Sequence, residues 1–142
     1  MITDIQVASR LFFAAVLGGV IGFERQKHNK RIAGLRTHIL VTVGSALIML
    51  VSIYLFETYE GRASVDPARI AAGVVTGIGF LGAGTIIRSG ENVQGLTTAA
   101  SLWTVSGIGL AVGCGFYIAG CAASIIALAT LYLLRKIPIE DK

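Results

Sequence analysis

Charged side chains stand at the borders of long uncharged runs in this chain, where they can bind an ion, pair with one another or contact a partner. Glu24 and Arg25 close the first run, and Arg36 opens the second. Ionisable groups at such borders are expensive to bury and often functional. They favour two interpretations: an ion-pair cluster that anchors the helices, or a cytoplasmic mouth for cations or a partner surface.

Asp66-Pro67-Ala68-Arg69 precedes the third uncharged run. An Asp directly before Pro is typical of a helix N-cap with proline at the first helical position. The alternative is that Asp66 helps bind an external divalent cation through its carboxylate oxygens. One carboxylate is too few for such a site, and Glu57 and Glu60 are the candidates to join it.

A row of hydroxyl groups lies along the fourth predicted helix, 96–113. Thr97, Ser101 and Thr104 share one face of a helix because they are spaced by four and three residues. Such hydroxyls bond to their own helix's carbonyls or join helices, or they line a path for an ion. The literal G-x-G-x-x-G at 77–82 lies inside an uncharged run, so it predicts no nucleotide site. We expect no enzymatic chemistry and no cofactor, with Mg²⁺ as the one ligand or substrate left open.

The uncharged runs themselves predict the fold. Residues 96–134 contain no charged side chain, and about 20 residues cross a bilayer, so this stretch contains two crossings with a break near 113–115. The chain is 54% hydrophobic and 14% charged. We therefore predict an all-α membrane protein, a single domain over 1–142. Its five transmembrane helices are expected at 5–23, 38–56, 70–87, 96–113 and 115–134.

The distribution of basic residues predicts the orientation. With the 24–37 connection in the cytoplasm, nine of the 12 Lys and Arg residues lie inside and three lie outside. This positive-inside bias places the N-terminus outside and the C-terminus in the cytoplasm. The bias also accounts for the net charge of +4, so we expect the lipid bilayer as the chain's environment and no nucleic-acid partner.

Glycines predict how the helices pack, because small residues let membrane helices approach closely. Those on the third helix fall on two faces, so we expect this helix at the centre of the bundle, with Arg88 at its end pointing inward towards Glu24 or Glu91. Trp103 is expected to be buried, and the surplus of small faces suggests a homodimer. The expected packing residues are Gly18, Gly22, Gly73, Gly77, Gly79, Gly82, Gly84 and Trp103.

Four stretches resemble the MgtC/SapB family of bacterial inner-membrane proteins. They are GGVIGFERQ (18–26), AGLRTHILVTVGSALIMLVS (33–52), DPARIAAGVVTGIGFLGAGTIIR (66–88) and GLTTAASLWTVSGIGLAVGCGFY (95–117). The family's shared polar positions correspond here to Glu24, Arg25, Arg36, Thr37, Asp66, Arg69, Arg88, Thr97 and Thr98.

The resemblance implies a function connected with magnesium homeostasis and virulence. It suggests a non-enzymatic regulator of the inner membrane, acting through helix contacts on a partner such as the membrane sector of ATP synthase. The alternative is a small transporter or channel for Mg²⁺ or another cation. Many relatives carry a soluble domain after the last helix, whereas eight residues follow Leu134 here, so we expect the transmembrane domain only.

Overall fold

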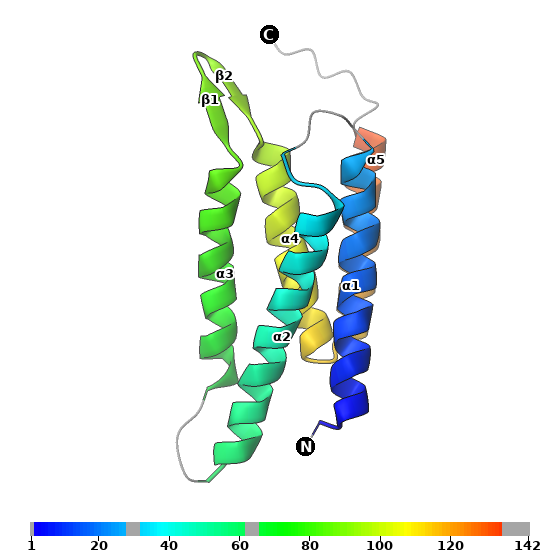
Figure 1. The fold of residues 1–142 in the computed structure, drawn as a ribbon, viewed down its shortest axis with the longest axis vertical. Helices are drawn as coiled ribbons and strands as arrows, with labels where there is room; N and C mark the ends of the chain where they lie inside the picture. The colour runs from blue at the N-terminus through cyan, green and yellow to red at the C-terminus, as the bar shows by residue number, and fades with distance from the viewer. Residues whose placement is uncertain (1, 28–31, 62–65, 135–142) are drawn as a thin grey trace.

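The computed structural model describes residues 2–27, 32–61 and 66–134, which form five helices and one β-hairpin (Figure 1). The helices are α1 (Asp4–Gln26), α2 (Leu35–Tyr59), α3 (Pro67–Gly84), α4 (Leu96–Gly113) and α5 (Tyr117–Leu133), and the strands are β1 (Ile87–Ser89) and β2 (Asn92–Gln94). The helices run up and down along the long axis of the molecule. The five-helix prediction is therefore confirmed, including the break in the 39-residue uncharged run.

Four of the described helices, α1 to α4, are long and apolar enough to cross a membrane, whereas α5 has 17 residues. The bundle has two distinct ends (Figure 1). The end of α1, the start of α2, the β-hairpin and the end of α5 lie together at what we call the hairpin end. The start of α1, the end of α2, the start of α3 and the α4–α5 turn lie at the opposite, amino-terminal end.

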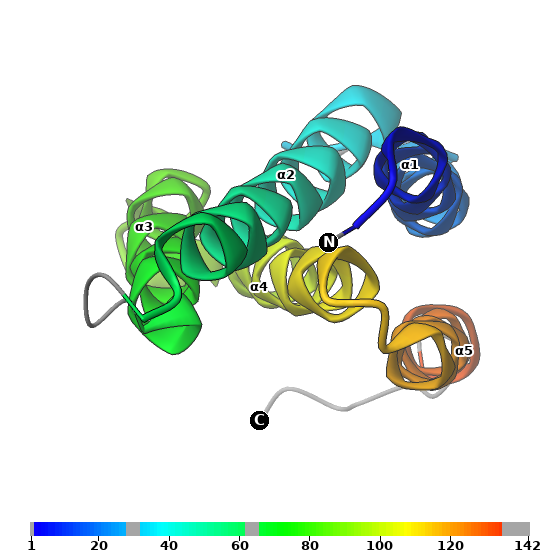
Figure 2. The ribbon, with the colours of Figure 1, turned by 90° about the horizontal axis from the view of Figure 1, so that it is seen from below.

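The centre of the bundle is formed by α2 and α4. Helix α4 contacts each of the other four helices, and α2 contacts α1, α3 and α4. Seen along the long axis, α3 lies at one edge and α5 at the other (Figure 2). The expectation that the third helix is central is therefore wrong for the single chain: α3 packs through one side, and of its residues only Ile78 and Gly82 are buried.

Glycines permit close contact where α1 and α4 meet α2. A Cβ added at Gly18 would meet the Thr42 side chain, and one at Gly22 would lie 2.8 Å from the Leu35 Cα. On α4, a Cβ at Gly113 would lie 2.6 Å from the Ala46 carbonyl oxygen. These positions hold the backbones closer than any side chain would allow.

The α3 glycines lie in a different setting from the one expected. A Cβ at Gly73, Gly77, Gly79 or Gly84 would meet nothing within 4 Å, and one at Gly82 would make an ordinary 3.6 Å contact with Ala99. Most of the expected packing face of α3 therefore points away from the chain's own helices. The same correction applies to Trp103 on α4, which is 59% exposed because its side of the helix has no neighbour within the described chain.

The connection after α3 is a β-hairpin, which was not predicted from the sequence. Helix α3 ends at Gly84 and Thr85 caps it, so Arg88 lies in β1 opposite Val93, exposed, with its Nε donating to the Gly90 carbonyl at 3.2 Å. The prediction that Arg88 ends the helix and points into the bundle is wrong, because the helix stops one turn earlier. Gly90 begins the two-residue turn with φ +63°, a conformation that glycine adopts readily.

Candidate functional site

A buried arginine lies at the hairpin end of the bundle. Arg25, in the last turn of α1, is 1% exposed, and its Nη2 donates to the Thr98 hydroxyl of α4 at 2.7 Å. Its Nε and Nη1 are buried and have no hydrogen-bond acceptor within residues 2–27, 32–61 and 66–134. Burying a guanidinium with donors unsatisfied is costly, so this position is a candidate site.

A histidine continues the polar contacts into α2. His38 is fully buried, with Nδ1 at 2.8 Å from the Gly34 carbonyl oxygen and Nε2 at 3.0 Å from the Ser101 hydroxyl. Ser101 also donates to the Thr98 carbonyl at 2.8 Å. Because a carbonyl only accepts, Nδ1 carries the hydrogen, and the single hydroxyl hydrogen of Ser101 serves either Nε2 or the Thr98 carbonyl in the neutral ring.

We call Arg25, Thr98, Ser101 and His38 the polar network. It joins α1, α4 and α2 through side chains that are all buried. Three of its members were predicted from the sequence: Arg25 as a charged residue at the border of the first uncharged run, Thr98 through the family resemblance and Ser101 as part of the hydroxyl row. His38 was not predicted, although a buried polar face on α2 was readable from His38, Thr42 and Ser45, spaced by four and three residues.

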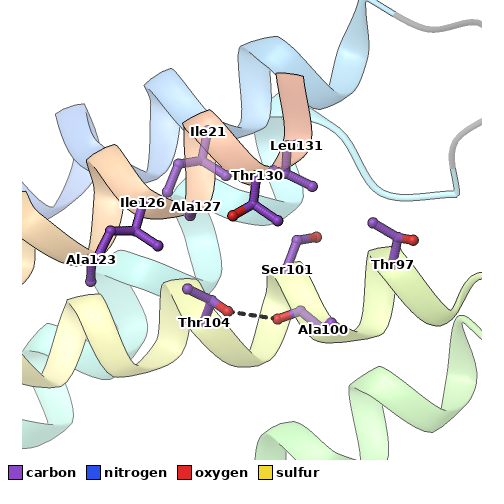
Figure 3. Close-up of a pocket in the computed structure, with 10 residues that line it drawn as sticks. All are labelled: Ile21, Thr97, Ala100, Ser101, Thr104, Ala123, Ile126, Ala127, Thr130 and Leu131. Carbon is purple, nitrogen blue, oxygen red and sulfur yellow. Dashed lines mark hydrogen bonds between the residues drawn. The ribbon is translucent and has the colours of Figure 1, made fainter. Parts of the chain in front are cut away.

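A cleft opens on the other side of Ser101, between α4 and α5 (Figure 3). Its volume is about 370 Å³. The side chains of the two helices face each other across it. The lining residues are Ile21, Thr97, Ala100, Ser101, Thr104, Ala123, Ile126, Ala127, Thr130 and Leu131. The hydroxyl row predicted for the fourth helix therefore lines one wall of a cleft, and Ser101 belongs both to that wall and to the polar network.

Other predicted polar residues lie near the hairpin end but outside the network. Glu24 borders a shallow depression beside α5, together with Leu128 and Tyr132. Arg36 is exposed in the first turn of α2, and Thr37 beside it is half-buried.

Asp66 and Arg69 lie at the opposite, amino-terminal end of the bundle. The Asp66 carboxylate accepts from the Ala68 backbone N–H at 2.9 Å, and Pro67 is the first residue of α3. This is the N-cap arrangement. Both Asp66 and Arg69 are exposed. Within the described residues, no three His, Cys, Asp or Glu side chains lie close enough together to hold a metal ion.

Comparison with known proteins now identifies the family. The MgtC family model matches residues 11–138, which include every member of the polar network. The chain belongs to the MgtC family.

Curated relatives of this MgtC-family chain share nearly half of its residues. It is 46% identical over 130 residues to a protein of Escherichia coli strain K12 named "Putative magnesium transporter YhiD", an alignment that covers 90% of this chain and 60% of that protein. It is 49% identical over 127 residues to Protein MgtC of Salmonella typhimurium strain LT2, covering 89% of this chain and 51% of the relative. Protein MgtC of Brucella abortus strain 2308 is 45% identical over 130 residues, covering 92% and 52%.

The chain thus spans between half and two thirds of the length of these relatives. No solved structure matches it. The family assignment and the apolar helices together make this a membrane protein. In this MgtC-family chain, the polar network lies towards the hairpin end, and the buried cluster of Ala14, Ala46, Val105, Ile108 and Val112 is apolar. At the amino-terminal end, Arg10 donates to the Gly113 carbonyl at 2.8 Å and Ser52 to the Pro67 carbonyl at 2.6 Å.

Proposed function

We propose that this MgtC-family chain is a non-enzymatic regulator of magnesium homeostasis in the bacterial inner membrane, acting through helix–helix contact with another membrane protein. The family resemblance points to the membrane sector of the F-type ATP synthase as that partner and to magnesium limitation and virulence-like stress as the setting. The name of the Escherichia coli relative supports the connection with magnesium.

The outward face of α3 is the observation that carries this proposal. Gly73, Gly77 and Gly84 place small residues on that face around the exposed Phe80, and a Cβ at any of the three would meet nothing within 4 Å in the described chain. Membrane helices associate through such small-residue faces because their backbones can approach closely. The face therefore suits a helix from another protein, and a second copy of the chain, in a homodimer, is the other candidate.

A cation transporter is the second candidate, favoured by the hydroxyl row along the α4–α5 cleft. Two observations weigh against it. The Arg25 guanidinium is buried next to that row, bonded to Thr98, and repels a divalent cation in a low-dielectric interior. The cluster around Val105 and Ile108 offers no oxygen ligands to replace the water of Mg²⁺.

Capture of the partner tests the regulator proposal. We expect Gly77→Leu to lower recovery of the ATP synthase membrane sector on the tagged chain about tenfold or more, because the added side chain separates the two backbones. Gly107→Leu, at an equally open glycine on α4, is the matched control and should recover as much as wild type. Equal recovery by both variants would show that the outward face of α3 does not contact the partner.

Magnesium flux distinguishes the two candidates directly. Purified wild type and Asp66→Asn are placed in liposomes that hold a trapped Mg²⁺-sensitive dye. We expect no uptake above that of empty liposomes. Saturable uptake by inserted wild-type protein, abolished in Asp66→Asn, would reject the regulator proposal and show that the chain is a transporter.

A further inference from the structure

The cleft between α4 and α5 has a shape that a thin, flexible chain would fill. Three alanines, Ala100, Ala123 and Ala127, line it where larger side chains would close it (Figure 3). Its volume of about 370 Å³ is too small for another helix, which with side chains is about 10 Å across. Because the surrounding medium is lipid, a lipid acyl chain is the apolar occupant at hand.

Two hydroxyl groups in this cleft lack partners. The hydroxyl groups of Thr97 and Thr130 form no hydrogen bond within the part of the chain that the structure describes, and both residues line the cleft. Other helical hydroxyls bond to their own helix: Thr104 donates to the Ala100 carbonyl at 2.9 Å and Ser124 to the Gly120 carbonyl at 2.8 Å. Since a polar group in a bilayer needs a partner, the occupant should offer oxygen acceptors here.

A buried cation and a helix N-terminus lie beside the hairpin end of the cleft, while Glu24, the residue before Arg25, borders a separate depression next to α5. The buried Arg25 reaches the first turn of α4 through Thr98, and its Nε and Nη1 find no acceptor in the described ranges. The N-terminus of α4 carries the positive end of the helix dipole, and Gly95 provides no side-chain cap. An anionic occupant is therefore favoured over a neutral one.

The depth of these groups matches that of a lipid headgroup. Helix α4 has 18 residues and is about 27 Å long, close to the hydrocarbon thickness of about 30 Å. Thr97 lies in the first turn of α4, and Thr130 lies in the last turn of α5. Both hydroxyls therefore lie near the bilayer surface, at the level where acyl chains join the ester and phosphate groups.

We propose that the α4–α5 cleft is a binding site for an anionic phospholipid. One acyl chain lies along Ala100, Ala123 and Ala127. The ester and phosphate oxygens accept hydrogen bonds from Thr97 and Thr130, in the positive field of Arg25 and the α4 N-terminus. This site goes beyond the proposed regulation and does not depend on it, since α3, the proposed partner face, lies across the bundle from α5 (Figure 2).

Photo-crosslinking locates the acyl chain. The purified full chain is placed in phosphatidylcholine nanodiscs that contain a few per cent of phosphatidylglycerol with a photoactivatable acyl chain. We expect the label on peptides of α4 and α5. Ala100→Phe, which fills the cleft, should reduce that labelling about fivefold, as loss of about 1 kcal/mol of binding implies. Ala72→Phe, at an exposed position of α3, is the matched control and should not reduce it.

Even labelling of all five helices, or equal labelling of Ala100→Phe and wild type, would overturn the site. Native mass spectrometry tests whether a second copy of the chain, and not a lipid, fills the cleft. A dimer that Ala100→Phe dissociates, with no bound lipid in the wild type, would assign the cleft to a second copy and reject the lipid.

A headgroup comparison tests the polar half of the proposal. Wild type should prefer the phosphatidylglycerol probe over a phosphatidylcholine probe of the same acyl chain about fivefold. Replacing both hydroxyls by Thr97→Val and Thr130→Val should reduce labelling by the phosphatidylglycerol probe by a similar factor, because each lost hydrogen bond weakens binding. Both positions are exposed, so these variants test binding without disturbing the core. Equal labelling by the two probes in wild type would reject the anionic preference.

Discussion

The Ser101 hydroxyl holds the buried histidine of α2 against α4. It lies 3.0 Å from the Nε2 of His38 and 2.8 Å from the Thr98 carbonyl oxygen. Both His38 and Thr98 are buried. The Ser101–His38 contact therefore links α4 to α2, and this structural role does not depend on a ligand in the neighbouring cleft.

We expect Ser101→Ala to lower the free energy of unfolding by about 1–3 kcal/mol, because it leaves His38 Nε2 without a partner in an apolar interior. Thr104→Val is the matched control: Thr104 lines the same cleft but bonds only to its own helix, so its loss should cost less than about 0.5 kcal/mol. Unfolding in detergent, followed by circular dichroism, measures both.

A double-mutant cycle with His38→Phe separates this bond from general damage. The coupling energy between Ser101→Ala and His38→Phe should be about 1 kcal/mol or more, as for residues in direct contact. Strictly additive effects would show that the two side chains do not interact.

Residue types alone could predict Asp66 but not the network. The Asp-Pro pair specifies an N-cap locally, and the structure has that cap. The network instead joins residues 63 and 73 positions apart in the sequence. Nothing local identifies which hydroxyl of the α4 row faces α2, and a lone His beside an apolar run lacks the spacing of a metal site.

At the scale of helices, α4 shows how glycine contributes in two ways. A Cβ at Gly109 would meet the Thr42 carbonyl oxygen and would lie 2.7 Å from the Ser45 Cβ. Two residues earlier, a Cβ at Gly107 would meet nothing within 4 Å, and this glycine is exposed. The same residue type on the same helix is therefore required at one position and dispensable at the other.

We expect Gly109→Ala to destabilise the fold by about 1–3 kcal/mol, because the backbone of α2 must move away. Gly107→Ala should instead stabilise it by about 0.5–1 kcal/mol, since alanine costs less conformational entropy in a helix. Thermal unfolding of the two variants in the same detergent tests the contrast. Equal effects in the same direction would show that α2 and α4 are not in close contact at Gly109.

This contrast explains why the helices were predictable and their arrangement was not. The length of an uncharged run fixes the number of crossings, so residues 96–134 had to form two helices. A small-residue face signals close packing without naming the neighbour. Of the α3 glycines that were expected to pack, only Gly82 is buried, whereas Gly73, Gly77, Gly79 and Gly84 meet nothing within 4 Å in the described chain. Close contacts lie at Gly18 and Gly22, which were expected to pack, and at Gly109 and Gly113.

The β-hairpin was missed for a similar reason. Strands of three residues, Ile87–Ser89 and Asn92–Gln94, are too short to show an alternating pattern. The readable signal was Gly90, followed by one polar residue, between two short segments that each contain a β-branched residue. Without it, the third helix was extended to residue 87, and Arg88 was placed inside the bundle.

For the molecule as a whole, the unequal charge of its two ends predicts its orientation in the membrane. The hairpin end collects Arg25, Lys27, Arg36 and Arg88 among the described residues, whereas Arg10 and Arg69 lie towards the other end. Basic residues stay on the cytoplasmic side during insertion. The hairpin end should therefore face the cytoplasm, and the α4–α5 turn should face outward.

Cysteine labelling in intact cells tests this orientation with a residue that the chain already has. Cys114, exposed just after α4 at the amino-terminal end, should react with a membrane-impermeant maleimide added outside. Ser89→Cys, in a chain that also carries Cys114→Ser, places the thiol in the hairpin and should react only after the membrane is permeabilised. Cys121→Ser in both chains removes the thiol within α5. Labelling of the hairpin thiol from outside, with Cys114 protected, would contradict the predicted orientation and favour the opposite one. The proposed anionic-lipid site, at the hairpin end, would then lie in the outer leaflet.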